Sequence, residues 1–227
     1  MKYVLYIFLI NTLYIQPISL RAQQVTTEST VSIEDKDFIM KLNIMLNNID
    51  NSIKILKEQI IQNQSAPLIA DLYLQLANLY IKKANTLYYI QMEKNKNTKT
   101  KKLDPVINAQ KEGIKIYQHI LRLFPTFEKK VKVMYLMAAA YKAMYDSINF
   151  IKEASKLTKT FPNTEYAIKT HILIADHLYS QNAYNEALSN LKPVIQSNYI
   201  YEKNLARYKA GLCYLRLEKF TNALTIF

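Results

Sequence analysis

The side chains that could act as acid–base catalysts or metal ligands are few in this sequence. It contains three histidines and one cysteine. His171 and His177 are six residues apart in a helical pattern, which places them on different faces, and no paired Cys or His-x-x-x-His spacing accompanies them. Asp176 precedes His177, but adjacent helical residues diverge and cannot form a proton relay. These spacings predict neither a metal site nor an acid–base pair.

Nucleophilic catalysis and phosphate binding are not indicated either. His119 stands alone, Gly113 and Gly211 do not form a glycine-rich loop, and no nucleophile with a partner base can be identified. Cys213 cannot make an internal disulfide, so its expected role is that of a small buried apolar residue. We therefore expect a protein that is not an enzyme and that holds no cofactor and no metal.

The composition argues against an all-β fold, and the helical periodicities along the chain predict an all-α fold. Its 227 residues include only two glycines and six prolines, so the tight turns that β-hairpins require are scarce. Half of the residues are apolar, Trp is absent and Tyr occurs 18 times. Tyrosine suits positions that pack on one side and meet water or a partner on the other.

Residues 1–22 have the pattern of a secretory signal peptide. A short basic start is followed by an apolar run from Tyr3 to Ile15, and cleavage is expected after Ala22. An uncleaved anchor is the alternative, although the run is shorter than the roughly 20 residues of a spanning helix. No cysteine lies at the expected cleavage region after the run, so a lipoprotein is not indicated. We expect an exported protein of the periplasm or outer membrane, with residues 23–32 as a flexible tether.

The positive charge of the chain has one local concentration. The formal net charge is +12, and the run from Lys94 to Lys102 gathers lysines without apolar residues. Such a run predicts a solvated loop, and weak contact with an anionic membrane or polyanion is the alternative. Nucleic-acid binding is not expected, because a secretory signal would move the chain away from it and the tyrosines lie at packing positions.

A long helix is predicted over residues 33–64. Apolar residues recur at steps of three and four between Phe38 and Ile60, which draws one stripe along the helix. The stripe is compatible with a short coiled coil, and we interpret it as a surface that packs on the next helix.

One pattern occurs twice in the last third of the chain. Ile174-Ala175, Tyr184 and Ala187 are matched 36 residues later by the second copy. A period of 34 to 36 residues with small residues at fixed offsets is typical of stacked helical hairpins. Residues 66–227 are thereby divided into hairpins at 66–125 (with an insertion at 94–103), 131–162, 168–201 and 204–227, the last incomplete.

These offsets resemble the tetratricopeptide repeat (TPR), whose consensus has small residues at positions eight and twenty. Those positions are filled in the two copies by Ala175, Ala187, Gly211 and Ala223. His171 and Arg207 depart from the usual Trp at position four. The resemblance implies a right-handed α-solenoid of helical hairpins. With the signal peptide and the linker at 161–164, the chain is similar to BamD-like and Tol-Pal coordinator proteins of the bacterial envelope.

The same resemblance implies a scaffold that holds a protein or peptide on its concave face. The residues expected to line this face are Asn78, Lys82, Tyr135, Lys142, Asp176, Tyr179, Tyr208 and Arg216. Ordinary solvated helix surface is the alternative for these positions. Tyr135 and Ala139 replace two residues of the carboxylate clamp found in chaperone-binding TPRs, so that ligand is not expected. A further alternative is that the chain is the N-terminal part of a longer multi-repeat protein whose activity lies beyond Phe227.

Overall fold

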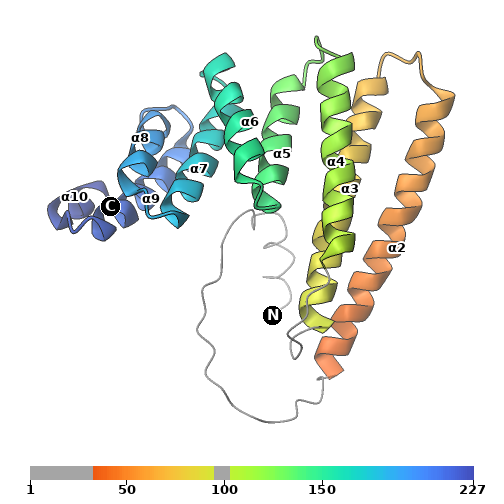
Figure 1. Ribbon diagram of the computed structural model, residues 1–227, viewed down its shortest axis with the longest axis horizontal. Coiled ribbons are helices and arrows are strands. Elements are labelled where there is room, and N and C mark those ends of the chain that lie inside the picture. Colours follow the sequence, from red (N-terminus) through yellow and green to blue (C-terminus); the bar gives the residue numbers. More distant parts are fainter. Residues whose placement is uncertain (1–32, 95–102) are drawn as a thin grey trace.

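The computed structural model describes residues 33–94 and 103–227 (Figure 1). Helices hold 83% of these residues and no strand occurs among them, which confirms the all-α prediction for this part of the chain. The predicted signal peptide, the tether and almost all of the lysine run lie outside the described residues. Within them, none of the helices combines the length and apolarity needed to cross a membrane.

The N-terminal region consists of three long helices. They are α2 (Ile33–Gln62), α3 (Ile69–Lys94) and α4 (Asp104–Leu123). At 1.5 Å per residue they are about 45, 39 and 30 Å long. The helix α3 packs against both α2 and α4 (Figure 1). The predicted stripe of α2 faces α3, where Ile49, Ile53 and Leu56 are buried against residues such as Leu76.

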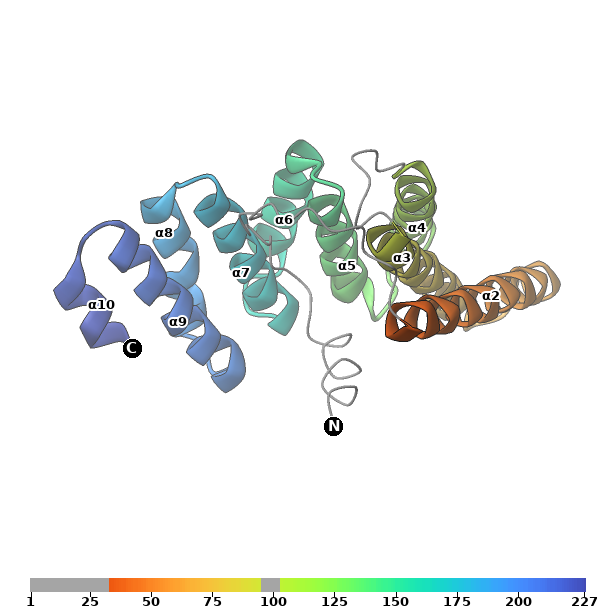
Figure 2. The same cartoon turned by 90° about the horizontal axis from the view of Figure 1, so that it is seen from below.

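The C-terminal region consists of six shorter helices. They are α5 (Lys130–Ala143), α6 (Ser147–Thr160), α7 (Glu165–Ser180), α8 (Tyr184–Ile195), α9 (Ile200–Arg216) and α10 (Phe220–Ile226). Each helix packs against the next, and α7 also contacts both α5 and α9 (Figures 1 and 2). Helix pairs thus follow one another in a repeat-like arrangement.

The same turn closes α5, α7 and α9. Tyr145, Asn182 and Glu218 have φ of 59°, 61° and 59°, and they lie 37 and 36 residues apart. In each turn the next backbone N–H donates to the carbonyl five residues earlier, as in Asp146 to Tyr141 at 3.0 Å. This is the Schellman motif, which satisfies carbonyls at the helix end and usually employs glycine in the left-handed position. The sequence repeat therefore corresponds to a repeat of backbone geometry.

Side-chain caps start two of these helices. Thr164 accepts a hydrogen bond from the backbone N–H of Ala167 at 3.2 Å, and Asp146 accepts one from that of Asn149 at 3.1 Å. Both caps satisfy donors that a helix start leaves without partners. Because Thr164 caps α7, this helix begins at Glu165, ahead of residue 168, where the hairpin was expected to begin.

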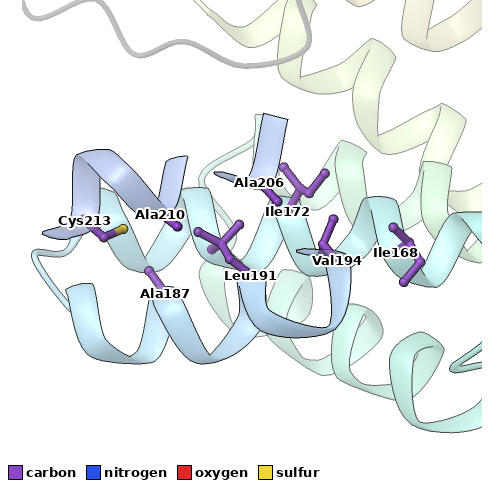
Figure 3. Close-up of a cluster of buried hydrophobic side chains, with 9 residues drawn as sticks. Ile168, Ile172, Ala187, Leu191, Val194, Ala206, Ala210 and Cys213 are labelled. Atoms are coloured by element: carbon purple, nitrogen blue, oxygen red, sulfur yellow. The ribbon is translucent and has the colours of Figure 1, made fainter. Parts of the chain in front are cut away.

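Small residues let the helices of the C-terminal region approach closely. Ala187 on α8 and Ala206 and Ala210 on α9 are buried in one cluster with Leu191 and Val194 (Figure 3). Alanine allows backbones to come near, and the larger side chains fill the remaining space. In α6 the position equivalent to Ala187 is Phe150, which is fully buried.

Candidate functional site

The centre of the candidate site is Asp176 on α7. The Nζ atom of Lys209, on α9, lies 2.6 Å from its Oδ1, and that of Lys142, on α5, lies 3.7 Å from its Oδ2. The three side chains are only 13 to 18% exposed. One carboxylate is therefore shared by two ammonium groups from two other helices, and we call these residues the charge cluster.

Lys142 is the member of the charge cluster whose charged form is disfavoured by burial. Loss of hydration, which Lys209 reinforces and Asp176 opposes, lowers the pKa of Lys142 to about 8. Its buried Nζ makes no hydrogen bond in the described part of the chain, because 3.7 Å is too long for one. The same Nζ lies 5.9 Å from the ring centre of Phe150. Burial and the Lys142 charge together lower the pKa of His177. The cluster thus carries one more positive than negative group.

A second pair of interacting side chains lies towards the ends of α7 and α9. The Nε of Arg216 donates to the hydroxyl of Tyr179 at 3.2 Å, which raises the pKa of Arg216. The ring of Tyr179 meets that of Tyr184 edge-on at 5.3 Å. Arg216 itself is exposed. An arginine and a tyrosine from different helices are therefore presented next to each other.

Aromatic and charged groups also meet near the start of α7. The rings of Tyr135 and Tyr166 lie 5.6 Å apart, and the Nζ of Lys169 is 5.8 Å from the ring centre of Tyr166. Lys169 pairs with Glu165 and lies 3.7 Å from the carboxylate of Glu202 on α9. We call the surface that joins these residues, the charge cluster and the Tyr179–Arg216 pair the α5–α7–α9 face.

The structure brings together only part of the predicted set. Tyr135, Lys142, Asp176, Tyr179 and Arg216 belong to the α5–α7–α9 face. The remaining predicted residues, Asn78, Lys82 and Tyr208, have other neighbours.

Asn78 and Lys82 line a depression of about 470 Å³ between α2 and α3, together with Ile55 and Gln59. Asn78 accepts a hydrogen bond from the hydroxyl of the buried Tyr117 at 2.7 Å, so it also supports the packing of α4. Tyr208, on α9, has its ring 6.2 Å from that of Phe227, which follows α10. These three residues were grouped with the rest through the repeat frame, which does not take account of the long helix α2.

Sequence reasoning missed five residues of the α5–α7–α9 face, namely Glu165, Tyr166, Lys169, Glu202 and Lys209. The last three are charged residues that pair between helices. A signal for them exists in the spacing of opposite charges. Lys142 precedes Asp176 by 34 residues, and Asp176 precedes Lys209 by 33, as Lys169 precedes Glu202. Such offsets, slightly shorter than one repeat, connect residues of neighbouring helices on the same face.

The other chemically versatile residues are held in packing roles. Burial lowers the pKa of His171, whose Nδ1 lies 3.3 Å from the side-chain oxygen of Asn190. Burial also raises the pKa of the Cys213 thiol to about 11. Across residues 33–94 and 103–227, no three His, Cys, Asp or Glu side chains are placed to share a metal ion. What the face offers is ionic, hydrogen-bonding and aromatic contact.

No protein-family model matches the chain, and no curated protein is similar to it in sequence. Among solved structures, BtubC (BKLC) from P. vanneervenii is similar with a TM-score of 0.47 and 10% sequence identity, over 82% of this chain and 87% of that chain. The function must therefore be inferred from the residues of this chain.

Proposed function

We propose that this chain is a right-handed α-solenoid of tetratricopeptide-like hairpins that binds another protein of the cell envelope and catalyses no reaction. The observation that carries the proposal is the α5–α7–α9 face, where side chains from three successive hairpins meet on one surface. A binding surface shared by several repeats is what a repeat scaffold offers to an extended partner.

The solenoid part of the proposal is supported by the backbone. Three identical turns follow each other at intervals of 37 and 36 residues. Small residues recur in the same frame at Ala138, Ala175 and Gly211, and all three are buried. A regular offset between hairpins generates a superhelix whose first helices share one face.

The protein-binding part is supported by the residue types on the face. Tyrosine and arginine are enriched among the residues that dominate protein interfaces, because they combine a large apolar area with hydrogen bonding. Arg216 and Tyr179 offer this combination. The surplus ammonium of the charge cluster adds an attraction for acidic groups of a partner.

The proposed cellular location rests on the amino-acid pattern of residues 1–22. We propose export to the periplasm, with removal of these residues. Sequencing the N-terminus of the protein recovered from the periplasm tests this step, and we expect it to begin at Gln23. An intact Met1 in the membrane fraction would instead assign an anchor.

Capture from envelope extract, with a matched pair of variants, tests the binding function. The purified chain is immobilised and the retained proteins are identified by mass spectrometry. Arg216→Ala removes an exposed arginine of the face, and Arg122→Ala removes an exposed arginine from the end of α4. We expect one protein to be retained by wild type and by Arg122→Ala, and to be reduced at least fivefold by Arg216→Ala.

Two outcomes count against the proposal. Capture of no protein at low salt would contradict a scaffold function. A partner retained equally by both variants would place the binding surface away from the α5–α7–α9 face.

A further inference from the structure

Contacts across the α5–α7–α9 face occur at three levels along its helices, which follow one another along the molecule (Figure 2). At the first level, near the start of α7, Lys169 lies 3.7 Å from the carboxylate of Glu202 on α9. The charge cluster forms the second level, and the hydrogen bond between Arg216 and Tyr179 forms the third. The residue numbers rise from level to level on both helices, so α7 and α9 run in the same direction along the face.

The levels differ in the sign of their surplus charge. At the first level the carboxylates of Glu165 and Glu202 share the ammonium group of Lys169. The second level has two ammonium groups around the single carboxylate of Asp176. The third adds the guanidinium of Arg216, which donates to a hydroxyl. One end of the face therefore has a surplus carboxylate, and the opposite end has surplus cations.

A partner can reach the charged groups at both ends of the face. Glu165 is exposed at the first level and Arg216 at the third, whereas the charge cluster between them is largely buried. Glu165 and Tyr179 are 14 residues apart on α7, as are Glu202 and Arg216 on α9. At about 1.5 Å per residue, the two ends are about 21 Å apart.

Each end of the face also has a pair of tyrosine rings. The ring centres of Tyr135 and Tyr166 are 5.6 Å apart at the first level, and those of Tyr179 and Tyr184 are 5.3 Å apart at the third. All four side chains are half-buried. Because tyrosine combines an apolar ring with a hydroxyl, each end can contact the apolar part of a bound side chain as well as its charge.

The middle of the face favours an extended partner over a helical one. A docking helix lays an apolar stripe into a hydrophobic groove. The middle of this face is instead the charge cluster. An extended segment can place charged side chains at both ends and polar backbone groups between them. Because such a segment advances about 3.3 Å per residue, about six residues cover the separation of the two ends.

We propose that the α5–α7–α9 face binds an extended segment of its partner, in which basic residues lie over Glu165 and acidic residues, about six positions away, lie over Arg216. This inference rests on the proposed function and adds the chemistry of the partner. The opposite charges at the two ends of the face select such a segment and fix its direction. A uniformly acidic or uniformly basic segment meets repulsion at one end.

The probe is a synthetic bipolar peptide, Lys-Lys-Val-Ser-Ser-Val-Glu-Glu, which is acetylated, amidated and fluorescently labelled. Its control, Lys-Glu-Val-Ser-Ser-Val-Lys-Glu, has the same composition and net charge but no separation of charge. Both peptides are titrated into the full chain at low salt, where screening is weakest, and followed by anisotropy. We expect saturable binding of the bipolar peptide, at least tenfold tighter than that of the control.

Glu165→Lys reverses the charge at the first level. We expect it to weaken the bipolar peptide at least fivefold. A peptide with glutamates at both ends should bind this variant at least fivefold more tightly than wild type, which a damaged fold would not produce. Glu112→Lys is the matched control, because the side chains of Glu112 and Glu165 are 46% and 47% exposed and each pairs with a lysine of its own helix. It should leave both affinities unchanged.

Arg216→Glu reverses the charge at the opposite end. It should weaken the bipolar peptide at least fivefold and strengthen the binding of a peptide with lysines at both ends by a similar factor. Arg122→Glu, at an exposed position near the end of α4, is the control that should leave both affinities unchanged.

Several results would overturn the inference. They are no binding of the bipolar peptide, equal binding of its control, or equal effects of Glu165→Lys and Glu112→Lys. Tighter binding of the glutamate peptide than of the bipolar peptide to wild type would assign the face to a uniformly acidic partner. These failures would leave standing a partner whose capture Arg216→Ala reduces. Capture of no protein, together with charge-dependent binding of the bipolar peptide, would contradict the scaffold function alone.

Discussion

The two regions of this molecule are both helical but are stabilised in different ways. The helices α2, α3 and α4 have 30, 26 and 20 residues, and α2 is held by a continuous apolar stripe along its length. The helices α5 to α10 have 7 to 17 residues and depend on small residues and on a repeated turn. The helix α2 thus depends on one extended apolar contact, whereas the shorter helices depend on several separate junctions.

The two regions also differ in how exposed their paired charged side chains are. On α2 and α3, Lys83 and Asp50 pair at 2.6 Å with side chains 29 and 45% exposed. The charge cluster of α5, α7 and α9 is far less exposed. Exposed pairs contribute little to stability, while buried charges are costly unless compensated. The comparison indicates that the C-terminal region keeps buried charge at a cost in stability.

The largest expected effect comes from removing a core side chain of one region. Leu191→Ala should lower the free energy of unfolding by about 3 kcal/mol, because it leaves a cavity between α7, α8 and α9. Where each helix packs against the next, this loss acts mainly on neighbouring elements. Hydrogen exchange should therefore accelerate in α7–α9 and stay unchanged in α2 and α3.

Ile120→Ala is the reciprocal variant, since Ile120 is fully buried between α3, α4 and α5. Its effect should centre on those helices. Equal acceleration along the whole chain in both variants would mean that the two regions unfold as one unit.

The next effect concerns the charge cluster. Asp176→Asn leaves two buried ammonium groups without their carboxylate, and we expect a loss of about 2 kcal/mol in urea unfolding. Asp50→Asn, which breaks the exposed pair of α2 and α3, should cost less than about 0.5 kcal/mol. Similar losses in both variants would remove the electrostatic difference between the regions.

Lys142 should also give stability a characteristic pH dependence. Its pKa is about 8 in the folded protein and 10.5 when unperturbed, so between these values the unfolded chain binds more protons. The free energy of unfolding should therefore rise from pH 8 to pH 10.5 on account of this residue. Lys142→Met should remove that rise and add about 1 kcal/mol at pH 7. Lys152→Met, at an exposed position of α6, is the control that should keep it.

A smaller effect compares the two glycines, one in each region. At Gly113 a Cβ would meet Ile81 at 2.8 Å and the carbonyl oxygen of Ala77 at 3.2 Å, so Gly113→Ala should cost about 1 kcal/mol. At Gly211 the three atoms that a Cβ would meet first all belong to the ring of the exposed Phe227. That ring can turn away, and Gly211→Ala should gain about 0.5 kcal/mol from helix propensity. Urea midpoints of the two variants should move in opposite directions.

The smallest expected effect sharpens the importance of the turns. Tyr145→Gly and Glu218→Gly should each raise the free energy of unfolding by about 0.5 kcal/mol, because glycine adopts positive φ without strain. Asn182→Gly should change it less, since asparagine tolerates this conformation. Thermal melting of the three variants tests the order. Destabilisation by Tyr145→Gly would show that its side chain has a role.

Much of the fold could be predicted from the sequence because its signals are local. The stripe between Phe38 and Ile60 follows helical periodicity, and α2 covers residues 33–62 of the predicted 33–64. In the structure α4 begins at Asp104 with Pro105 in its first turn, and α7 begins after the cap Thr164, and these residue types favour helix starts. Helix starts and apolar stripes depend on neighbouring residues, which a single sequence contains.

The candidate site was only partly predictable because it depends on how helices are rotated against each other. Asp176 was singled out by its place in the repeat frame, but its strongest partner, Lys209, was not. Lys209 lies two residues before Gly211, and only the rotation of α9 on α7 decides which side it faces. Asn78, which the repeat frame placed in the same set, accepts a hydrogen bond from the hydroxyl of the buried Tyr117 and lies beside the long α2. Rotation follows from packing over the whole region, which periodicity does not encode.

The burial of Cys213 has an experimental consequence. It is the chain's single cysteine, and its thiol lies in the cluster between α7, α8 and α9, where burial raises the pKa to about 11. A thiol that is both enclosed and protonated reacts slowly with alkylating reagents. Its labelling rate in native protein therefore reports how often α9 separates from its neighbours. Mass spectrometry of Cys213 alkylation can therefore measure the opening rate of the last helices in the unmodified protein. No engineered label is needed.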